Sequence, residues 1–600
     1  MASCELCIER ADYITVYLRN NEGQIENEKL QFAKAINYYL SHKKPIIREC
    51  NLIMGTLTSK LKGIHLYPEI GDLAIWRSLR MKGLKETEVR KLNEDIFPYW
   101  MKRDLATYLI TNNENTQQLV EFMNQGFCKI EEYRGFIPDF RMILEQGLEK
   151  ILKEVDDKSK DIKARSLNIN GNKSTEEKLL FYESIKEIGD GLLKYVVNLG
   201  EKAKLLSEET ENQLQKQIYF KMARTCSKIP AQAADSFYEA IQCIWFCIIT
   251  MGAEYSLDGM SLGRLDQILY PYYEKDLLMG KVTREEAFYL IKELCTKLYE
   301  CKNLKEESTL GITLGGINEK GEDGVNAVTY LFLRALKSLK EEIPVVNVRI
   351  HKDKNVDEYI KYAETISNEA PIIIQEDSES IKKLIRKGVG LESSRNYAVL
   401  ADGILARTGL SYEGSQKLCI DVRDIFKLTL RNGRRQETGR KQWGPLTGEA
   451  ENIDSFEEFL KAFQKQGEWF IKQSIASLEA KEEVIKAKVQ WPFAAILSKG
   501  CLERGSDLIN GGSIYADVRI RKYGIGETAK LLAYVEQKIF SESGSSFEKN
   551  LETLKDEKAY IQIDFDNISE KIILEYTTWI QNFLQTALRG YSNSRGGRYL

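Results

Sequence analysis

Histidine, the residue used most often for proton transfer and metal binding, is scarce in this chain. There are only three, His42, His65 and His351, in 600 residues. A histidine-rich metal site or a histidine proton relay is therefore hard to build. Any chemistry must use carboxylates, tyrosines or thiols.

One carboxylate, Asp402, lies beside a glycine in a turn-like stretch and has two interpretations. As a buried acid with a raised pKa, it would exchange protons with a small molecule, assisted by Glu413 or Tyr412. As a turn residue, it would accept a hydrogen bond from the backbone just after it, beside Gly403. No partner histidine or metal cluster is visible in the sequence, which favours the turn.

Thiols are more numerous, with eleven cysteines at irregular spacing. An odd number without a regular pattern argues against a disulfide framework. Cys4 and Cys7 form a CxxC pair, but no second pair completes a zinc site. Cys243 and Cys247 lie one helical turn apart in an apolar stretch, which is typical of core packing. We expect no bound metal.

Composition describes a globular protein with no charge bias. The chain is 43% hydrophobic and 29% charged, with a net charge of −3 and a pI near 6.1. This balance predicts no nucleic-acid partner. The apolar run Ile241–Met251 is too short to span a membrane and predicts a buried helix. Because the N-terminal sequence MASCELCIERADY lacks the features of a signal peptide, we expect a cytoplasmic protein.

The elements that must position these residues follow two patterns. Residues 1–200 are mainly helical, and within them Ile151–Ser174 is polar enough to suggest an exposed loop. From about residue 230 to 600, helices alternate with β-branched runs at Gly311–Gly316, Val345–Ile350 and Ile372–Asp377. Such alternation predicts parallel strands buried on both faces in one large α/β domain.

Several separate segments resemble the glycyl radical enzymes of the pyruvate formate-lyase and diol-dehydratase type. PIIRECNLIMGTLT with IHLYPE, and GFIPDFRMILEQGL, are similar to N-terminal segments of that family. SLGRLDQILYPYYEKD, TLGGINEKGEDGVNAVTYL and CLERGSDLINGGSIY are similar to its central and later signatures. Taken residue by residue they also have structural interpretations: Gly263 as a turn, and Arg264 with Asp266 as a buried ion pair. The resemblance implies a ten-stranded α/β barrel with a helical N-terminal layer.

The resemblance also implies where the family's radical cysteine should lie. Asn396 and Tyr397 match the residues that precede its GCVE segment, and IFKLTLRNG matches a later helix end that often reads LELALNNG. The ungapped alignment places Asp402 on the radical cysteine and Ile404 on the acid/base glutamate. A carboxylic O–H bond is much stronger than a thiol S–H bond, so Asp402 could not relay a radical. Cys419 is the substitute that a shifted loop would supply, although its setting between Leu418 and Ile420 suggests packing.

The last residues bear on the radical glycine. RGGRYL resembles a family segment that precedes the glycyl radical domain, so we expect that domain to lie outside this chain. The chain is then a fragment, or the domain is a separate polypeptide, or the protein has lost it. Gly590, followed by Tyr591, is an alternative radical glycine, but Ala587 stands where that motif has arginine.

Three functions stay open. The first is a radical lyase or dehydratase on a small metabolite, a homodimer activated by a radical S-adenosylmethionine enzyme, with a glycyl radical only if the C-terminal domain exists and no other cofactor. The second is a non-radical relative that binds a small molecule in the barrel. The third is acid/base chemistry by Asp402.

Overall fold

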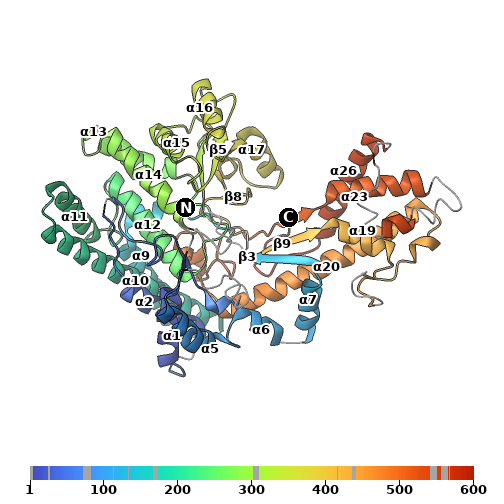
Figure 1. The fold of residues 1–600 in the computed structure, drawn as a ribbon, viewed down its shortest axis with the longest axis horizontal. Helices are drawn as coiled ribbons and strands as arrows, with labels where there is room; N and C mark the ends of the chain where they lie inside the picture. Colours follow the sequence, from blue (N-terminus) through green and yellow to red (C-terminus); the bar gives the residue numbers. More distant parts are fainter. Residues whose placement is uncertain are drawn as a thin grey trace. The chain divides into compact units, whose positions relative to one another are not determined.

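The computed structural model describes residues 5–24, 27–49, 51–71, 83–111, 114–132, 134–166, 173–301, 310–414, 416–435, 441–540, 551–555, 565 and 568–600 (Figure 1). These residues fall into two compact units. Unit 1 comprises Met1–Tyr108, Tyr133–Gly414 and Ile485–Ala516. Unit 2 comprises Leu109–Glu132, Ser415–Val484 and Asp517–Leu600. Cys4, half of the CxxC pair, lies outside the described residues.

The first part of unit 1 is a helical layer, as the sequence predicts. Its long helix α10 packs along α2 and α11 (Figure 1). Asparagine side chains cap the first turns of two of these helices, since Asn27 and Asn212 accept hydrogen bonds from the following backbone amides. The helices of this layer are α1 (Glu9–Asn20), α2 (Glu28–His42), η1 (Pro68–Ile70), α4 (Glu86–Lys91), η2 (Leu92–Ile96), α5 (Phe97–Trp100), α6 (Leu105–Thr111, which continues into unit 2), α8 (Arg141–Gln146), α9 (Leu148–Ser166), α10 (Lys173–Glu209) and α11 (Gln213–Cys226).

The described part of the segment expected to be a loop is instead helical, and residues 167–172 lie outside the described residues. Residues 151–166 belong to α9, and α10 begins at Lys173. The helix buries a narrow stripe of Leu148, Ile151 and Val155 and exposes its polar faces. The prediction was wrong because the polar composition hid a helical spacing of three and four residues.

The apolar run of residues 241–251 lies in helix α12 (Phe237–Glu254), which is buried along its whole length. Among the described residues, no helix is long and apolar enough to span a membrane. Cys243 and Cys247 are both fully buried in α12, which confirms their role in packing. The remaining helices of unit 1 are α13 (Leu265–Leu278), α14 (Arg284–Glu300), α15 (Ala327–Leu339), α16 (Asp357–Ser367), α17 (Asp377–Arg386), α18 (Leu391–Arg395), α21 (Pro492–Ile496) and α22 (Cys501–Arg504).

The predicted parallel strands of unit 1 are confirmed. Strands β4 (Gly311–Gly315), β5 (Val345–Ile350) and β6 (Ile372–Glu376) form a parallel sheet in that order. Strands β4 and β5 are buried, whereas Ile373 and Ile374 of β6 are 50% and 38% exposed. The expectation of burial on both faces therefore fails at β6, an edge strand of this sheet.

The other strands belong to smaller sheets. In unit 1, β1 (Glu5–Cys7) pairs with β2 (Gly63–His65), and β7 (Tyr397–Val399) forms a hairpin with β8 (Leu405–Arg407). Within the described part of the chain the strands form four separate sheets, so their hydrogen bonding does not by itself show a closed ten-stranded barrel. The fold is mixed α/β and mostly helical.

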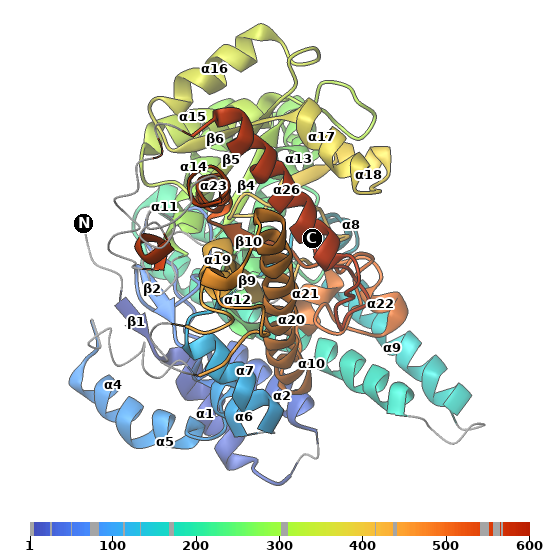
Figure 2. The same cartoon turned by 90° about the vertical axis from the view of Figure 1, so that its right-hand side faces the viewer.

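Unit 2 has its own sheet and core. Strand β9 (Gln416–Asp421) lies between β10 (Ile520–Tyr523) and β3 (Cys128–Glu132). Figure 2 shows the helices gathered around this sheet, and their apolar faces form one continuous core. The helices of unit 2 are α7 (Glu114–Asn124), α19 (Val422–Leu430), η3 (Ala450–Asn452), α20 (Phe456–Lys488, which continues into unit 1), α23 (Ile525–Tyr534), η4 (Val535–Ile539) and α26 (Glu570–Leu588).

At the end of α12, a buried carboxyl group joins two segments of unit 1. Glu254 is 2% exposed. Its carboxyl group accepts hydrogen bonds from the backbone amides of Phe493 and Ala494, at 2.5 and 3.1 Å. Burial raises the pKa of Glu254 to about 8, despite those two donors and with a further contribution from Asp507. The folded protein thus holds this group protonated at neutral pH.

This raised pKa predicts a pH dependence of stability. Because the folded pKa lies above that of the unfolded chain, the contribution of Glu254 is complete below the unfolded pKa and is lost as pH rises toward 8. The expected slope from this single group is at most about 1.4 kcal/mol per pH unit. Urea unfolding between pH 5 and 9 should show a shallower decline in Glu254→Gln than in the parent protein; superimposable pH profiles would contradict the assignment.

Candidate functional site

The loop that the resemblance marks as catalytic is the tip of the β7–β8 hairpin in unit 1. The Leu400 amide donates to the Ile404 carbonyl at 2.8 Å, and the Gly403 amide donates to the Leu400 carbonyl at 2.9 Å. Gly403 has φ of +89°, a conformation that favours glycine. The hairpin therefore ends in a tight, defined turn.

Asp402 lies at this turn and is half-buried. Its carboxylate accepts a hydrogen bond from the Ile404 amide at 3.3 Å, which confirms the turn-residue interpretation. The alternative of a buried carboxylate does not fit its exposure. Ile404 packs beside a small apolar cluster that includes Ile137 and Leu400, so the position that the resemblance gives to an acid/base glutamate serves packing.

A buried ion pair anchors the base of the hairpin. Arg349 of β5 and Asp377 of α17 both have side chains without exposed surface, and they are joined by hydrogen bonds of 2.7 and 3.0 Å. Arg349 also donates to the carbonyl of Tyr397, and the Tyr397 hydroxyl donates to Asp377 at 2.7 Å. Although burial opposes its charge, Arg349 keeps the pKa of Asp377 below its ordinary value. The first residue of β7 is thus fixed at both its backbone and its ring.

The signature pair Arg264 and Asp266 has a related role. Arg264 donates to the Gly315 carbonyl at 2.7 Å, and Asp266 accepts from the Gly315 amide at 2.8 Å. The expected ion pair between the two is wrong, because each binds the backbone at the end of β4 instead. The pair fixes the strand that lies next to the hairpin.

Breaking the Arg349–Asp377 pair should be strongly destabilising. Asp377→Ala leaves a buried guanidinium without its carboxylate, and we expect a loss of about 3 kcal/mol or more in the free energy of unfolding. The paired variant Arg349→Met/Asp377→Leu removes both charges and should lose less than Asp377→Ala alone. Urea unfolding measures both; an Asp377→Ala variant as stable as the parent would show that the pair does not anchor the hairpin.

One face of the β4–β5–β6 sheet is turned toward the hairpin. The Thr313 hydroxyl accepts a hydrogen bond from the Val399 amide at 2.9 Å. A Cβ added at Gly311, on the same face two residues earlier, would lie 3.3 Å from the Ala401 nitrogen. Asn347 is the neighbour of Thr313 in register on β5 and points to this face.

Asn347 is a buried polar residue of this region whose side chain lacks hydrogen-bond partners among the described residues. It is 1% exposed, and among the described residues neither its amide nitrogen nor its oxygen has a hydrogen-bond partner. A buried amide without partners is costly, so such a group in a folded protein requires a reason. Its place beside the hairpin makes it a candidate contact for a small polar ligand.

Thr313 and Asn347 were not among the predicted site residues, although the sequence contains a signal for both. Each is a polar residue inside a largely apolar, β-branched strand, GITLG and VVNVRI. A polar residue at a buried strand position is more informative than the apolar residues around it.

The residues considered as partners of Asp402 are buried in unit 1. Tyr412 packs its ring edge-on against Trp491 at 5.6 Å between centroids. The Glu413 carboxylate lies 3.9 Å from the Arg407 guanidinium. Both side chains are thus held within the core, at 0% and 2% exposure.

The candidate substitute Cys419 lies in the other unit, on the central strand β9. It is 5% exposed, and burial raises the pKa of its thiol. Leu418 and Ile420 face the core of unit 2, so Cys419 points to the opposite face of the sheet. Among the described residues, no group of histidines, cysteines and carboxylates could hold a metal ion.

Comparison with known proteins identifies similar sequences along nearly the whole chain. The family model "Pyruvate formate lyase-like" matches residues 1–571. The trans-4-hydroxy-L-proline dehydratase of Clostridioides difficile is 27% identical over 580 residues, covering 92% of this chain and 72% of that protein. The (2S)-3-sulfopropanediol dehydratase of Klebsiella oxytoca is 25% identical over 607 residues, covering 94% and 71%.

Solved structures share the fold. The glycerol-bound B12-independent glycerol dehydratase of Clostridium butyricum superimposes with a TM-score of 0.88 at 25% identity, covering 99% of this chain and 78% of that one. A glycyl radical enzyme from Archaeoglobus fulgidus gives a TM-score of 0.89 at 22% identity, covering 100% and 79%. The fold is therefore that of glycyl radical enzymes.

Proposed function

The chain belongs to the pyruvate formate lyase-like family, and on that premise we propose that it acts on a small hydroxylated or aminated metabolite as a lyase of the dehydratase type. The observation that carries this proposal is the set of polar groups on the sheet face beside the β7–β8 turn. Thr313 and Asn347 are buried there, and Asn347 is without a partner among the described residues. The names of the dehydratases and sulfite-lyases among its relatives refer to small oxygenated compounds.

The site's architecture is part of the same proposal. The architecture we propose is an α/β barrel of the family type, with the hairpin tip carrying the reactive loop. The likeness of fold to solved glycyl radical enzymes supports this arrangement. A barrel interior of this kind can enclose a small polar substrate.

The radical parts of the proposal rest on the resemblance alone. They are a glycyl radical held outside the described loop, an activating enzyme that uses S-adenosylmethionine, a homodimer and a cytoplasmic location. The hairpin residues do not fit the family's thiol relay, since residue 402 is an aspartate that already accepts the Ile404 amide. We therefore derive no radical step through this loop, and Cys419 stays the candidate thiol.

A second function is favoured by that same aspartate. A relative without radical chemistry would bind the metabolite beside the hairpin, and it would not require a thiol at position 402. In this case the half-buried carboxylate is available to exchange protons with a bound ligand while it maintains the turn.

Electron paramagnetic resonance separates the two functions. The complete gene product, treated anaerobically with an activating enzyme proven on another family member, should show a glycyl doublet if the radical function is correct. A doublet that is absent under these conditions would overturn the radical function. Asp402→Asn keeps the acceptor of the turn and removes the charge, so it should leave the radical signal unchanged and abolish turnover only if Asp402 transfers protons.

The side-chain amide of Asn347 gives a test that does not require turnover. Asn347→Leu removes a buried polar group without a partner, so we expect unchanged or higher stability, by up to about 1 kcal/mol, together with weaker binding of the probes trans-4-hydroxy-L-proline and glycerol. Thr313→Val is the matched control, because it removes a satisfied hydrogen bond and should lower stability. Calorimetric binding and urea unfolding give the two readouts. Equal destabilisation by both variants, with binding retained, would exclude Asn347 from the site.

A further inference from the structure

A histidine that the proposed function does not use lies inside the helical layer of unit 1. His65, the last residue of β2, is 4% exposed, whereas His42 is exposed and His351 is half-buried. In the β1–β2 pair, His65 is the neighbour of Cys7 in register. Histidine is the side chain whose charge ordinarily changes between pH 5 and 8. The chain therefore places one such group in a core.

Two tyrosine rings pack against this imidazole. Tyr39 of α2 and Tyr67, two residues after the end of β2, meet it edge-on, with ring centroids 6.3 and 5.9 Å away. Each tyrosine also contacts a buried cation. Lys43 donates to the Tyr39 hydroxyl at 3.2 Å, and the Arg10 guanidinium lies over the Tyr67 ring, 4.3 Å from its centroid. A cation thus lies beyond each aromatic neighbour of His65.

The carboxylates of this cluster are paired with those two cations. Glu69 accepts a hydrogen bond from Arg10 at 2.7 Å, and the Glu9 carboxylate lies 3.7 Å from the Lys43 ammonium. Burial keeps the tyrosines neutral, since it raises the pKa of Tyr39, Tyr67 and Tyr195. The titratable and charged groups of the elements packed around His65 are Cys7 of β1, Glu9 and Arg10 of α1, Tyr39 of α2, Lys43 just after α2, Tyr67 and Glu69 after β2, and Tyr195 of α10.

Packing alone does not account for a histidine at this position. Among the described residues, neither nitrogen of the His65 ring has a hydrogen-bond partner of good geometry. A phenylalanine would fill the same space without burying two polar atoms. The Leu57 carbonyl favours a proton on the ring, but this acceptor is shared with Lys43, which donates to it at 3.0 Å.

These surroundings keep the imidazole neutral. Burial is the main cause, and the charges of Lys43 and Arg10 add to it, so the pKa of His65 is well below its ordinary value of 6.5 despite the Leu57 carbonyl. A proton bound to His65 would add a third positive charge to a region whose two carboxylates, Glu9 and Glu69, are already paired.

We propose that His65 makes the packing of the helical layer sensitive to acid: the neutral imidazole is accommodated between β2, α1 and α2, and its protonation opens this contact. Because the folded protein binds this proton more weakly than the unfolded chain, the contribution of His65 to stability is complete above pH 6.5 and is lost as pH falls. The equilibrium constant for local opening of the layer should therefore rise by up to about tenfold for each pH unit between 6.5 and 5.

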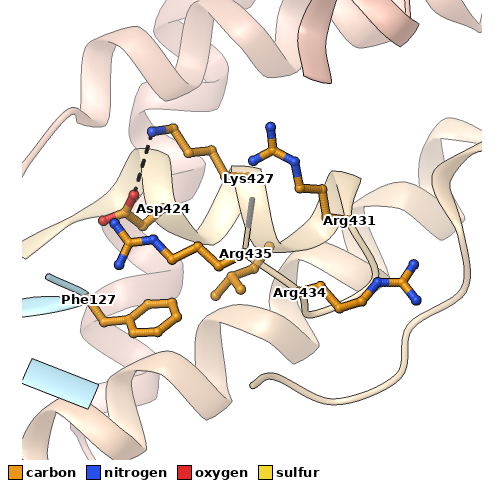
Figure 3. A pocket seen from close by; sticks show the side chains of 7 residues that line it. Phe127, Asp424, Lys427, Arg431, Arg434 and Arg435 are labelled. Atoms are coloured by element: carbon orange, nitrogen blue, oxygen red, sulfur yellow. Dashed lines mark ion pairs between the residues drawn. The ribbon is translucent and has the colours of Figure 1, made fainter. Parts of the chain in front are cut away.

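Asp424 of α19 also titrates in this range, but with the opposite sign. Figure 3 shows it beside Lys427, whose ammonium lies 3.9 Å from its carboxylate, at a pocket of unit 2. Burial raises the pKa of Asp424 to about 6, so its protonation stabilises the folded chain as pH falls. A measurement confined to the helical layer of unit 1 therefore separates His65 from Asp424.

Amide hydrogen exchange of the full chain between pH 7.5 and 5, corrected for the intrinsic exchange rate at each pH, measures this opening. Protection of β1, β2, α1 and α2 should fall by up to about tenfold per pH unit below 6.5, whereas α19 and α20 of unit 2 should show no such decline. His65→Phe and His65→Gln cannot take up the proton and should abolish the decline in the helical layer. His351→Gln, at a half-buried histidine elsewhere in unit 1, is the matched control and should behave like the parent protein.

A second readout does not require a folded His65 variant. The chain has three histidines, so selective isotope labelling gives three imidazole signals in magnetic resonance spectra, and His42→Gln and His351→Gln identify two of them. The third signal should titrate well below pH 6.5. The proposal is overturned if that signal titrates at pH 6.5 or above, if protection of the layer in the parent protein does not change below pH 6.5, or if the decline persists in a folded His65 variant. None of these outcomes depends on the hairpin site.

Discussion

The buried guanidinium of Arg349 is the constraint on which the hairpin region depends. It is fully enclosed, and it donates to Asp377, to the backbone carbonyls of Tyr397 and Arg395, and to that of Ile317. A guanidinium cannot lose its charge in a protein, so all of its donors must be satisfied once it is buried. Strand β5, the start of α17, the end of α18 and strand β7 are therefore assembled around one side chain.

This constraint explains why the hairpin can keep its shape while its chemistry changes. The ring and backbone of Tyr397 are held by Arg349 and Asp377, and Val399 is held by Thr313. None of these contacts involves residue 402. The loop Leu400–Ile404 is thus free to carry a cysteine, an aspartate or another short residue without disturbing its support, as long as the turn at Gly403 can form.

Both units contain buried polar groups that connect segments far apart in the chain. Unit 1 holds ionised or neutral carboxyl groups, such as Asp377 and Glu254, that connect segments far apart in the chain. Unit 2 surrounds its sheet with an apolar core, and it too holds a buried ion pair, between Arg595 and Glu482 of α20. Buried polar contacts specify one arrangement more sharply than apolar packing does, since an alternative packing would leave a charge unpaired.

The sequence by itself determined the family, the parallel strands and the buried helix α12, because these depend on local patterns and on motifs of contiguous residues. It also indicated that Asp402 supports a turn. It missed helix α9, whose narrow apolar stripe was hidden by polar composition. Only the tertiary structure decided that Arg349 pairs with Asp377 and that Asn347 lies beside Thr313. Those contacts join residues distant in the chain, and they are set by strand register and chain reversal, which residue types and spacing do not encode.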